Sequence, residues 1–341
     1  MGVTIKDIAE KTGLSITTIS LVLNKKESRI SEKTRHIIEN MAQELHYSPN
    51  HAAISLATRK TNTLGLIIPK GSYYRPDDML FPFEQACRNS GYNLSFSFAE
   101  GDEETCIEAI RSMLNRGVDG IVFDGSNVSE AFYGAYRELV LKSEIPIVSL
   151  SGSANNTDNN GGNLPNSILP DHQQGAYLAV SQLLDLGHSR IGCLLGPRDT
   201  PMTADFIRGS AEALKEFNRS PDSLPVFFSS YTAEAGHKEL DAILKQDITG
   251  IFAGSDVIAS GIFRRSYELS IPIPKQLSVI GYGNGSFAAD LYIPLTTIGV
   301  HFDRIARKAV HLIKRLGQDE GAQGTEFIQP SLIVRASTAR A

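Results

Sequence analysis

The chain of 341 residues has no tryptophan, only three cysteines and no long apolar run. Cys87, Cys106 and Cys193 are odd in number and lack the spacing of metal ligands, so we expect buried small hydrophobic residues in a reducing compartment rather than disulfides or a zinc site. No apolar run reaches membrane-spanning length and no signal peptide precedes the first helix, which predicts a cytoplasmic protein without a membrane partner. Nothing in the sequence predicts a cofactor.

Motifs of enzymes are also missing. There is no G-x-S-x-G elbow, phosphate-binding loop or H-E-x-x-H sequence. Gly281, Gly283 and Gly285 follow an expected strand much as in a dinucleotide-binding loop, but the third glycine comes one residue early and no helix with a downstream acidic residue is evident. Catalysis is therefore not expected, and turnover of a ligand by the purified protein would contradict this.

The net charge of −5 is unevenly distributed. Residues 1–60 hold nine Lys and Arg against six Asp and Glu, a net charge of +3. The remainder holds 33 − 9 = 24 basic and 38 − 6 = 32 acidic side chains, a net charge of −8. If the protein binds DNA, the amino-terminal segment therefore faces the phosphates and the acidic bulk does not.

The basic segment has the pattern of three short helices. Thr4 can cap a helix over residues 4–12, with Asp7 completing a capping box, and Gly13 supplies a left-handed turn. Ser15 can cap a second helix over residues 15–24, and Ser31 opens a third, whose expected apolar stripe is Ile37, Ile38, Met41 and Leu45. This order predicts a helix-turn-helix module. A small helical bundle without a nucleic acid partner is the alternative.

The second helix has two distinct faces. Ile19, Val22 and Leu23 are expected to point inward. The outer face, which can enter a major groove, carries Ile16, Thr17, Ser20, Leu21 and Asn24.

Beyond residue 60 the chain alternates β-branched apolar runs with amphipathic segments. Strands are expected at 64–68, 94–98, 120–123, 146–150, 190–195, 226–228, 250–253 and 277–282. Helical segments such as 103–115, 173–186 and 233–245 lie between them, which is typical of an α/β fold with doubly wound parallel sheets, and two such sheets fit the length. The Asn- and Gly-rich segment 152–166 is expected to be a surface loop, with a ligand lid as the alternative.

Several motifs resemble the lactose/galactose repressor (LacI/GalR) family. In the headpiece they are Ile5-Lys6-Asp7-Ile8-Ala9, Gly13-Leu14-Ser15, Thr18-Ile19-Ser20, Val22-Leu23-Asn24, Ser31-Glu32-Lys33-Thr34-Arg35 and Leu45-His46-Tyr47-Ser48-Pro49-Asn50. In the core, Leu64-Gly65-Leu66-Ile67-Ile68-Pro69, Leu194-Leu195-Gly196-Pro197 and Ser278-Val279-Ile280-Gly281-Tyr282 are similar to family landmarks.

The resemblance implies a domain organisation. Residues 1–60 would form a helix-turn-helix DNA-binding headpiece with a hinge helix at about 50–58. Residues 61–341 would form a periplasmic-binding-protein-like core of two Rossmann-like subdomains. These are an N-subdomain at about 61–168 and 302–328, and a C-subdomain at about 169–300 and 329–341. The crossovers would lie near 165–170, 298–302 and 329, with a ligand cleft between the subdomains.

The resemblance also implies DNA contacts. Ile16, Thr17 and Leu21 correspond to base-reading positions, and Arg29 to a further groove contact. Many relatives have Arg in place of Leu21, which offers only apolar contact, for instance to a thymine methyl, so the operator half-site should differ. Simple helix packing is the alternative for Ile16 and Leu21. Phosphate-contacting or helix-setting positions correspond to Thr4, Ser15, Thr18, Ser20 and Asn24.

A hinge helix is implied at residues 50–58. Asn50 can cap it, small residues such as Ala53 let two copies pack closely, and Leu56 would wedge into a central minor-groove step. Because so short a helix is marginal in water, it should fold only with both DNA and a dimeric partner. An inert linker is the alternative.

By the same resemblance, an effector pocket is expected in the cleft. Its departures from the sugar-binding pattern are Phe206 in place of a common Arg and Gly283 in place of a common Asp. An aromatic or anionic ligand, a different sugar held by other groups and a lost site all stay open. The expected pocket residues are Tyr73, Arg75, Asp124, Ser151, Asp171, Phe206, Ser255, Asp256 and Gly283.

These observations predict a transcriptional regulator, expected by the family resemblance to be a repressor, that binds a pseudo-palindromic double-stranded DNA operator as a homodimer. The chain has no heptad-bearing tail after the expected final strand, which favours a dimer over a tetramer. A small-molecule effector would control DNA affinity. The alternative is a repressor with a degenerate pocket that is controlled by a protein corepressor docking on the core.

Overall fold

The computed structural model describes residues 3–23, 30–47, 55, 58, 60–70, 75–125, 130–150, 166–318 and 324–341. The chain divides into two compact units, Met1–Thr61 and Asn62–Ala341. Among the described residues, no helix combines the length and apolar character needed to cross a membrane.

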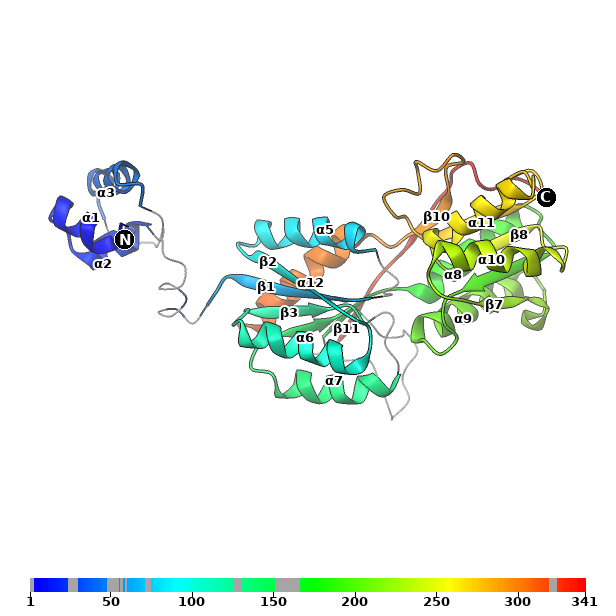
Figure 1. Cartoon of the computed structure of the whole chain (residues 1–341), viewed down its shortest axis with the longest axis horizontal. Helices are drawn as coiled ribbons and strands as arrows, with labels where there is room; N and C mark the ends of the chain where they lie inside the picture. The colour runs from blue at the N-terminus through cyan, green and yellow to red at the C-terminus, as the bar shows by residue number, and fades with distance from the viewer. Residues whose placement is uncertain are drawn as a thin grey trace. The chain divides into compact units, whose positions relative to one another are not determined.

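The first unit contains the three expected helices, α1 (Ile5–Thr12), α2 (Ile16–Leu23) and α3 (Glu32–Glu44) (Figure 1). The capping box at the start of α1 is confirmed, because the Thr4 backbone N–H donates to Asp7 Oδ2 at 2.7 Å. Gly13 ends α1 in the left-handed conformation, with φ of 70°. Each turn signal in the sequence therefore matches a helix boundary.

The core of this unit is small and differs from the expected stripe in one place. Ile37 is 44% exposed, whereas Ala42 is buried one turn further along α3. The error arose because Ile37 and Ile38 are adjacent and a helix cannot bury both on one narrow face. The buried side chains are Ile8, Ile19, Val22, Ile38 and Ala42.

The second unit contains two six-stranded sheets (Figure 1). The N-subdomain sheet has the order β11-β5-β4-β3-β1-β2, and the described pairings are all parallel. Its strands are β1 (Thr63–Pro69), β2 (Asn93–Ala99), β3 (Gly120–Phe123), β4 (Ile147–Ser149), β5 (Ser167–Pro170) and β11 (Thr325–Ile328). Central strands such as β1 are buried along nearly their whole length because helices cover both faces of the sheet.

The C-subdomain sheet has the order β12-β10-β9-β8-β6-β7, with β12 antiparallel to β10 and the other described pairings parallel. Its strands are β6 (Ile191–Leu195), β7 (Val226–Phe228), β8 (Gly250–Ala253), β9 (Ser278–Gly283), β10 (Thr296–Gly299) and β12 (Ser331–Ile333).

Helices flank each sheet. In the N-subdomain, α5 (Pro76–Asn89) packs against α12 (Phe302–Leu316), and α6 (Glu103–Asn115) and α7 (Glu130–Lys142) cover the other face (Figure 1). In the C-subdomain, α8 (His172–Asp185) pairs with α9 (Pro201–Glu216), and α10 (Ala233–Leu244) with α11 (Asp256–Glu268). A short 3-10 helix, η1 (Pro221–Ser223), precedes β7. Both subdomains are therefore Rossmann-like, as the family resemblance implied.

The chain passes between the sheets three times: between β5 and α8, between β10 and α12, and between β11 and β12. The three connections are hydrogen-bonded to one another. The Asp171 backbone N–H donates to Ile328 O at 3.0 Å, and Gln329 Nε2 donates to Asp171 Oδ2 at 3.3 Å. His301 Nε2 and Ser331 Oγ lie 2.9 Å apart.

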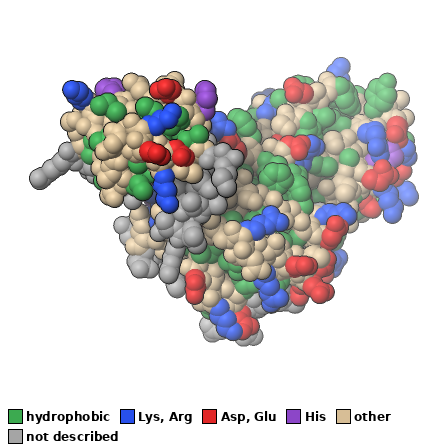
Figure 2. Space-filling model, turned by 60° about the vertical axis from the view of Figure 1, so that its left-hand side comes forward, with side chains coloured by type: hydrophobic (Ala, Val, Ile, Leu, Met, Phe, Trp, Pro, Cys, Tyr) green, Lys and Arg blue, Asp and Glu red, His purple; other side chains and the backbone are tan. Residues whose placement is uncertain are grey.

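Two expectations about side chains can be compared directly with the structure. Cys87, Cys106 and Cys193 are free and buried, as predicted, and burial raises the pKa of each thiol. Figure 2 shows acidic and basic side chains interspersed on the visible face of the second unit. Among the described side chains on that face, there is no large patch of one sign to attract DNA.

Candidate DNA interface and ligand pocket

The start of α2 presents a polar, accessible surface. The Ser15 side chain caps the helix by accepting from the Thr18 backbone N–H at 3.1 Å, and Ser15 Oγ and Thr18 Oγ1 lie 2.8 Å apart. Ile16 is 49% exposed, which is unusual for an isoleucine beside a hydrophobic core. Thr17 is exposed as well, so the first turn of α2 can contact another molecule.

Other predicted DNA-binding residues surround this turn. Thr4 is exposed at the start of α1, and Ser20 and Leu21 are half-buried. Leu21 therefore contributes partly to packing and partly to the surface. Five predicted residues lie outside the described part of the chain: Asn24, Arg29, Asn50, Ala53 and Leu56.

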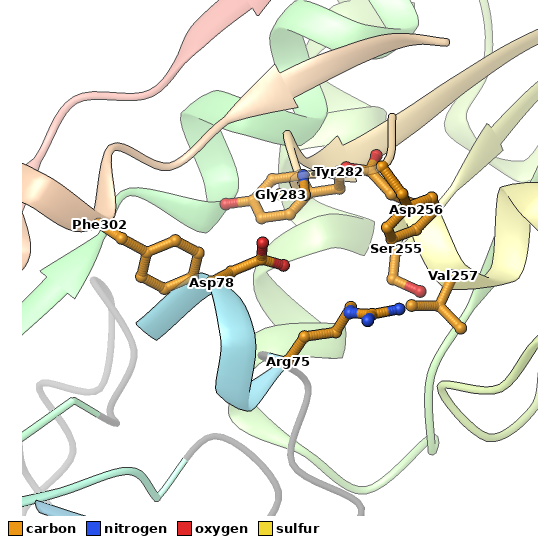
Figure 3. A pocket seen from close by; sticks show the side chains of 10 residues that line it. Arg75, Asp78, Ser255, Asp256, Val257, Tyr282, Gly283 and Phe302 are labelled. Atoms are coloured by element: carbon orange, nitrogen blue, oxygen red, sulfur yellow. Dashed lines mark hydrogen bonds between the residues drawn. The ribbon is translucent and has the colours of Figure 1, made fainter. Parts of the chain in front are cut away.

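A pocket lies in the second unit, lined from both subdomains (Figure 3). Four predicted effector residues line it: Arg75, Ser255, Asp256 and Gly283. Arg75 precedes α5, Ser255 caps α11 by accepting from the Ile258 backbone N–H at 3.0 Å, and Gly283 ends β9. These positions follow the carboxyl ends of parallel strands, where α/β sheets place their ligand sites.

Asp256 is the most constrained polar group of the pocket. Its residue is 3% exposed, Thr297 Oγ1 donates to Oδ1 at 2.5 Å, and the Gly285 backbone N–H donates to Oδ2 at 2.7 Å. Burial raises the pKa of its carboxyl to about 6, against the lowering effect of the two hydrogen bonds. Desolvation thus outweighs the donors, and the carboxylate can accept a proton at mildly acidic pH.

The structure does not bring Phe206 into the pocket. Its ring is fully buried, at 5.6 Å from the His172 ring and 4.7 Å from the Tyr282 ring, measured between centroids. His172 Nδ1 and Tyr282 Oη lie 2.8 Å apart, and burial lowers the pKa of His172 to about 3. Phe206 therefore packs behind Tyr282, which lines the pocket itself.

Asp124 and Asp171 are also absent from the described pocket lining. Asp124 is fully buried after β3. Asp171 caps α8 by accepting from the Gln174 backbone N–H at 2.9 Å, so its side chain stabilises the start of the helix that follows the first crossover. Tyr73 and Ser151 lie outside the described residues.

Sequence reasoning missed six residues of the lining. These are Asp78, Val257, Tyr282, Gly285, Phe287 and Phe302. Asp78 lies in the first turn of α5, three residues after the predicted Arg75, and Phe287 lies in the loop that follows β9. A search of the residues next to each predicted position would have found Val257 and Tyr282, but Phe302 comes from a distant crossover.

A helix-turn-helix headpiece joined to a core of two Rossmann-like subdomains defines a DNA-binding regulatory protein with a periplasmic-binding-protein-like core. Residues 4–50 match the model for bacterial regulatory proteins of the lacI family, and residues 180–338 match a periplasmic binding protein-like domain.

Known proteins are similar to this one over nearly the whole length of the chain. The HTH-type transcriptional repressor PurR of Vibrio vulnificus (strain CMCP6) is 30% identical over 97% of both chains. The HTH-type transcriptional regulator DegA of Bacillus subtilis (strain 168) is 29% identical over 99% of this chain and 98% of its own. A Lac repressor dimer bound to operator and the anti-inducer ONPF is 25% identical, with a TM-score of 0.84 over 99% of this chain and 100% of its own. The chain belongs to the lacI family and is a DNA-binding transcriptional regulator.

Proposed function

We propose that the protein is a repressor that binds a pseudo-palindromic DNA operator as a homodimer, with an affinity set by a small molecule in the pocket. The observation that carries this proposal is the exposed first turn of α2, where Ile16 and Thr17 follow the Ser15 cap. A recognition helix reads bases through its amino-terminal residues, so these side chains would enter the major groove.

The predicted contacts divide by chemistry. Ile16 and Leu21 can offer only apolar contact, which suits the thymine methyl group, while Thr17 can also donate or accept a hydrogen bond. Thr4, Ser15, Thr18 and Ser20 would hold the phosphates through their hydroxyls. Asn24, Arg29 and the hinge residues Asn50, Ala53 and Leu56 keep their proposed roles from the family resemblance.

Exposed aromatic side chains support a homodimer. Phe81 on α5 is 70% exposed, and Phe96 and Phe98 on the edge strand β2 are 51% and 53% exposed. The Phe96 and Phe98 rings form an edge-to-face pair at 5.7 Å. An edge strand with exposed aromatic rings is a liability in a monomer, and a second copy of the chain would cover it. Phe96→Glu should therefore lower the molar mass measured by sedimentation at micromolar concentration.

The charges of the pocket favour an uncharged or cationic ligand. Arg75 is paired with Asp77 at 2.5 Å, and two further carboxylates, Asp78 and Asp256, line the pocket. Ionised together, these four groups have a net charge of −2. An anion would meet a repulsion of a few kcal/mol from each nearby carboxylate, so the anionic ligand considered from the sequence is disfavoured. Phe287 and Phe302 offer apolar walls for a ring.

A thermal-shift screen of neutral sugars, sugar phosphates and aromatic amines tests this function, with each hit assayed for altered operator affinity. Neutral or cationic hits that change operator affinity support the proposal. Hits that leave DNA affinity unchanged contradict effector control. Retention of a phosphocarrier protein by the core, with DNA affinity indifferent to metabolites, would instead favour the protein-corepressor alternative.

A further inference from the structure

Two side chains at the start of α5 reach the opposite subdomain. Asp78 Oδ1 accepts a hydrogen bond from the Ser286 backbone N–H at 2.9 Å. The Arg75 guanidinium carbon lies 5.0 Å from the centroid of the Phe287 ring. Ser286 and Phe287 belong to the loop after β9, so both contacts join the subdomains at a place separate from the three chain crossovers.

The local structure at the start of α5 positions Arg75 and Asp78 for these contacts. Arg75 occupies the position before the helix, Pro76 begins it, and Asp77 forms an exposed ion pair with the guanidinium. Asp78 lies in the first turn, where the helix dipole favours a negative charge. Arg75 extends from α5 toward Ser255 and Val257 (Figure 3).

The loop side is equally constrained. The buried Asp256 carboxylate accepts from the Gly285 backbone N–H at 2.7 Å and so fixes the residue before Ser286. A Cβ atom at Gly285 would lie 3.2 Å from Asp78 Oδ2 and 3.1 Å from Phe287 Cε1. Because the contact with Asp78 would be tighter than most, the absence of a side chain at Gly285 lets the loop lie close to α5.

We propose that Asp78 is a positioning residue of the pocket, and that its bond to Ser286 holds the two subdomains closed in the ligand-free protein. This inference rests on the proposed function only in taking the pocket as the effector site. Arg75, Asp78, Gly285 and Phe287 all line the pocket, so an entering ligand meets the groups that close it. A ligand that donates to Asp78 replaces the Ser286 bond and releases the closed arrangement.

The strength of the Asp78–Ser286 hydrogen bond sets how far its loss should shift the closed–open equilibrium. A carboxylate that accepts from a backbone N–H contributes more than a neutral pair, but Asp78 is only half-buried and water competes for it. Loss of the bond should therefore shift the ratio of closed to open molecules about three- to tenfold toward open.

Distance measurements between spin labels on the two subdomains test this directly. Labels would be placed at Glu104→Cys on α6 and Lys238→Cys on α10, both exposed, in full-length protein diluted with unlabelled chain. The native cysteines are buried and should not compete for the label. The Asp78→Ala variant should populate a second, differently spaced distance distribution, while Asp78→Asn, which keeps the acceptor oxygen, should resemble the parent.

Asp77→Ala is the matched control. It removes a neighbouring carboxylate of the same charge whose ion pair with Arg75 is exposed and contributes little. An Asp78→Ala distribution identical to the parent's, or an Asp77→Ala shift equal to that of Asp78→Ala, would overturn the proposal. The distance measurement needs neither DNA nor effector. A protein that bound no operator and no ligand would refute the proposed function, but the distances measured between the labels would be unaffected.

Discussion

The buried carboxylate of Asp256 should make the free energy of unfolding depend on pH. Substitution of Asp256 by asparagine should remove this dependence. The pKa of the carboxyl is raised from 3.8 to about 6 by burial. Between these values the folded protein retains a proton that the unfolded chain has released, so stability falls as the pH rises through this window. Converted at about 1.36 kcal/mol for each pH unit, the full loss above pH 6 is about 3 kcal/mol.

Asp256→Asn removes the charge and keeps the shape. The amide oxygen can accept from the Gly285 backbone N–H, and the amide nitrogen can donate to the Thr297 hydroxyl, so both existing partners retain a hydrogen bond. The free energy of unfolding of the variant minus that of the parent should therefore rise by up to about 3 kcal/mol between about pH 4 and pH 7.5.

Urea unfolding followed by far-ultraviolet circular dichroism measures this difference, at one protomer concentration because a dimer's stability depends on it. Asp77→Asn is the control. The hydrogen bond from Arg75 lowers the pKa of Asp77, so that substitution should change the pH dependence in the opposite direction, and weakly because the pair is exposed. A difference between Asp256→Asn and the parent that is constant across this pH range would refute the reasoning.

Three further substitutions test other parts of the molecule. Ile38→Ala should cost about 2–5 kcal/mol in the small headpiece core and abolish specific DNA binding while the calorimetric transition of the core is unchanged; loss of the core transition would contradict independent units. His172→Phe should reduce the loss of stability on acidification below about pH 6.5, by about 1.4 kcal/mol per pH unit. Burial lowers the pKa of His172 to about 3, so in this pH range only the unfolded chain binds the proton. Parallel pH profiles of the variant and the parent would contradict this. Leu21→Arg should alter the preferred base at one half-site position by about 1–3 kcal/mol in competition binding, and an unchanged preference at every position would count against Leu21 as a base contact.

Much of the fold was predictable because its central strands are buried on both faces. The expected strands at 120–123, 226–228 and 250–253 agree with β3, β7 and β8 to the residue. Short strands next to the crossovers, such as β5 and β12, were not predicted. Their pairing depends on segments distant in the sequence, since β5 pairs with β11 and β12 pairs with β10.

The pocket was predicted less completely for a physical reason. Alignment of motifs places a residue along the chain, but rotation of the helix decides whether its side chain reaches the cleft. Phe206 on α9 turned into the core beside Tyr282, while Asp78, three residues after Arg75 and thus on the same side of α5, lines the pocket. The contacts between Asp78 and Ser286 join segments 208 residues apart, which no local pattern indicates.

Selection from a random pool of duplex DNA tests the central claim most directly. Full-length protein at about 0.15 M salt should enrich a two-fold symmetric sequence and bind it at least about 10³ times more tightly than unselected DNA. Ile38→Ala should enrich nothing. If the folded, dimeric parent protein enriches no sequence, the assignment of α2 as a base-reading helix is contradicted.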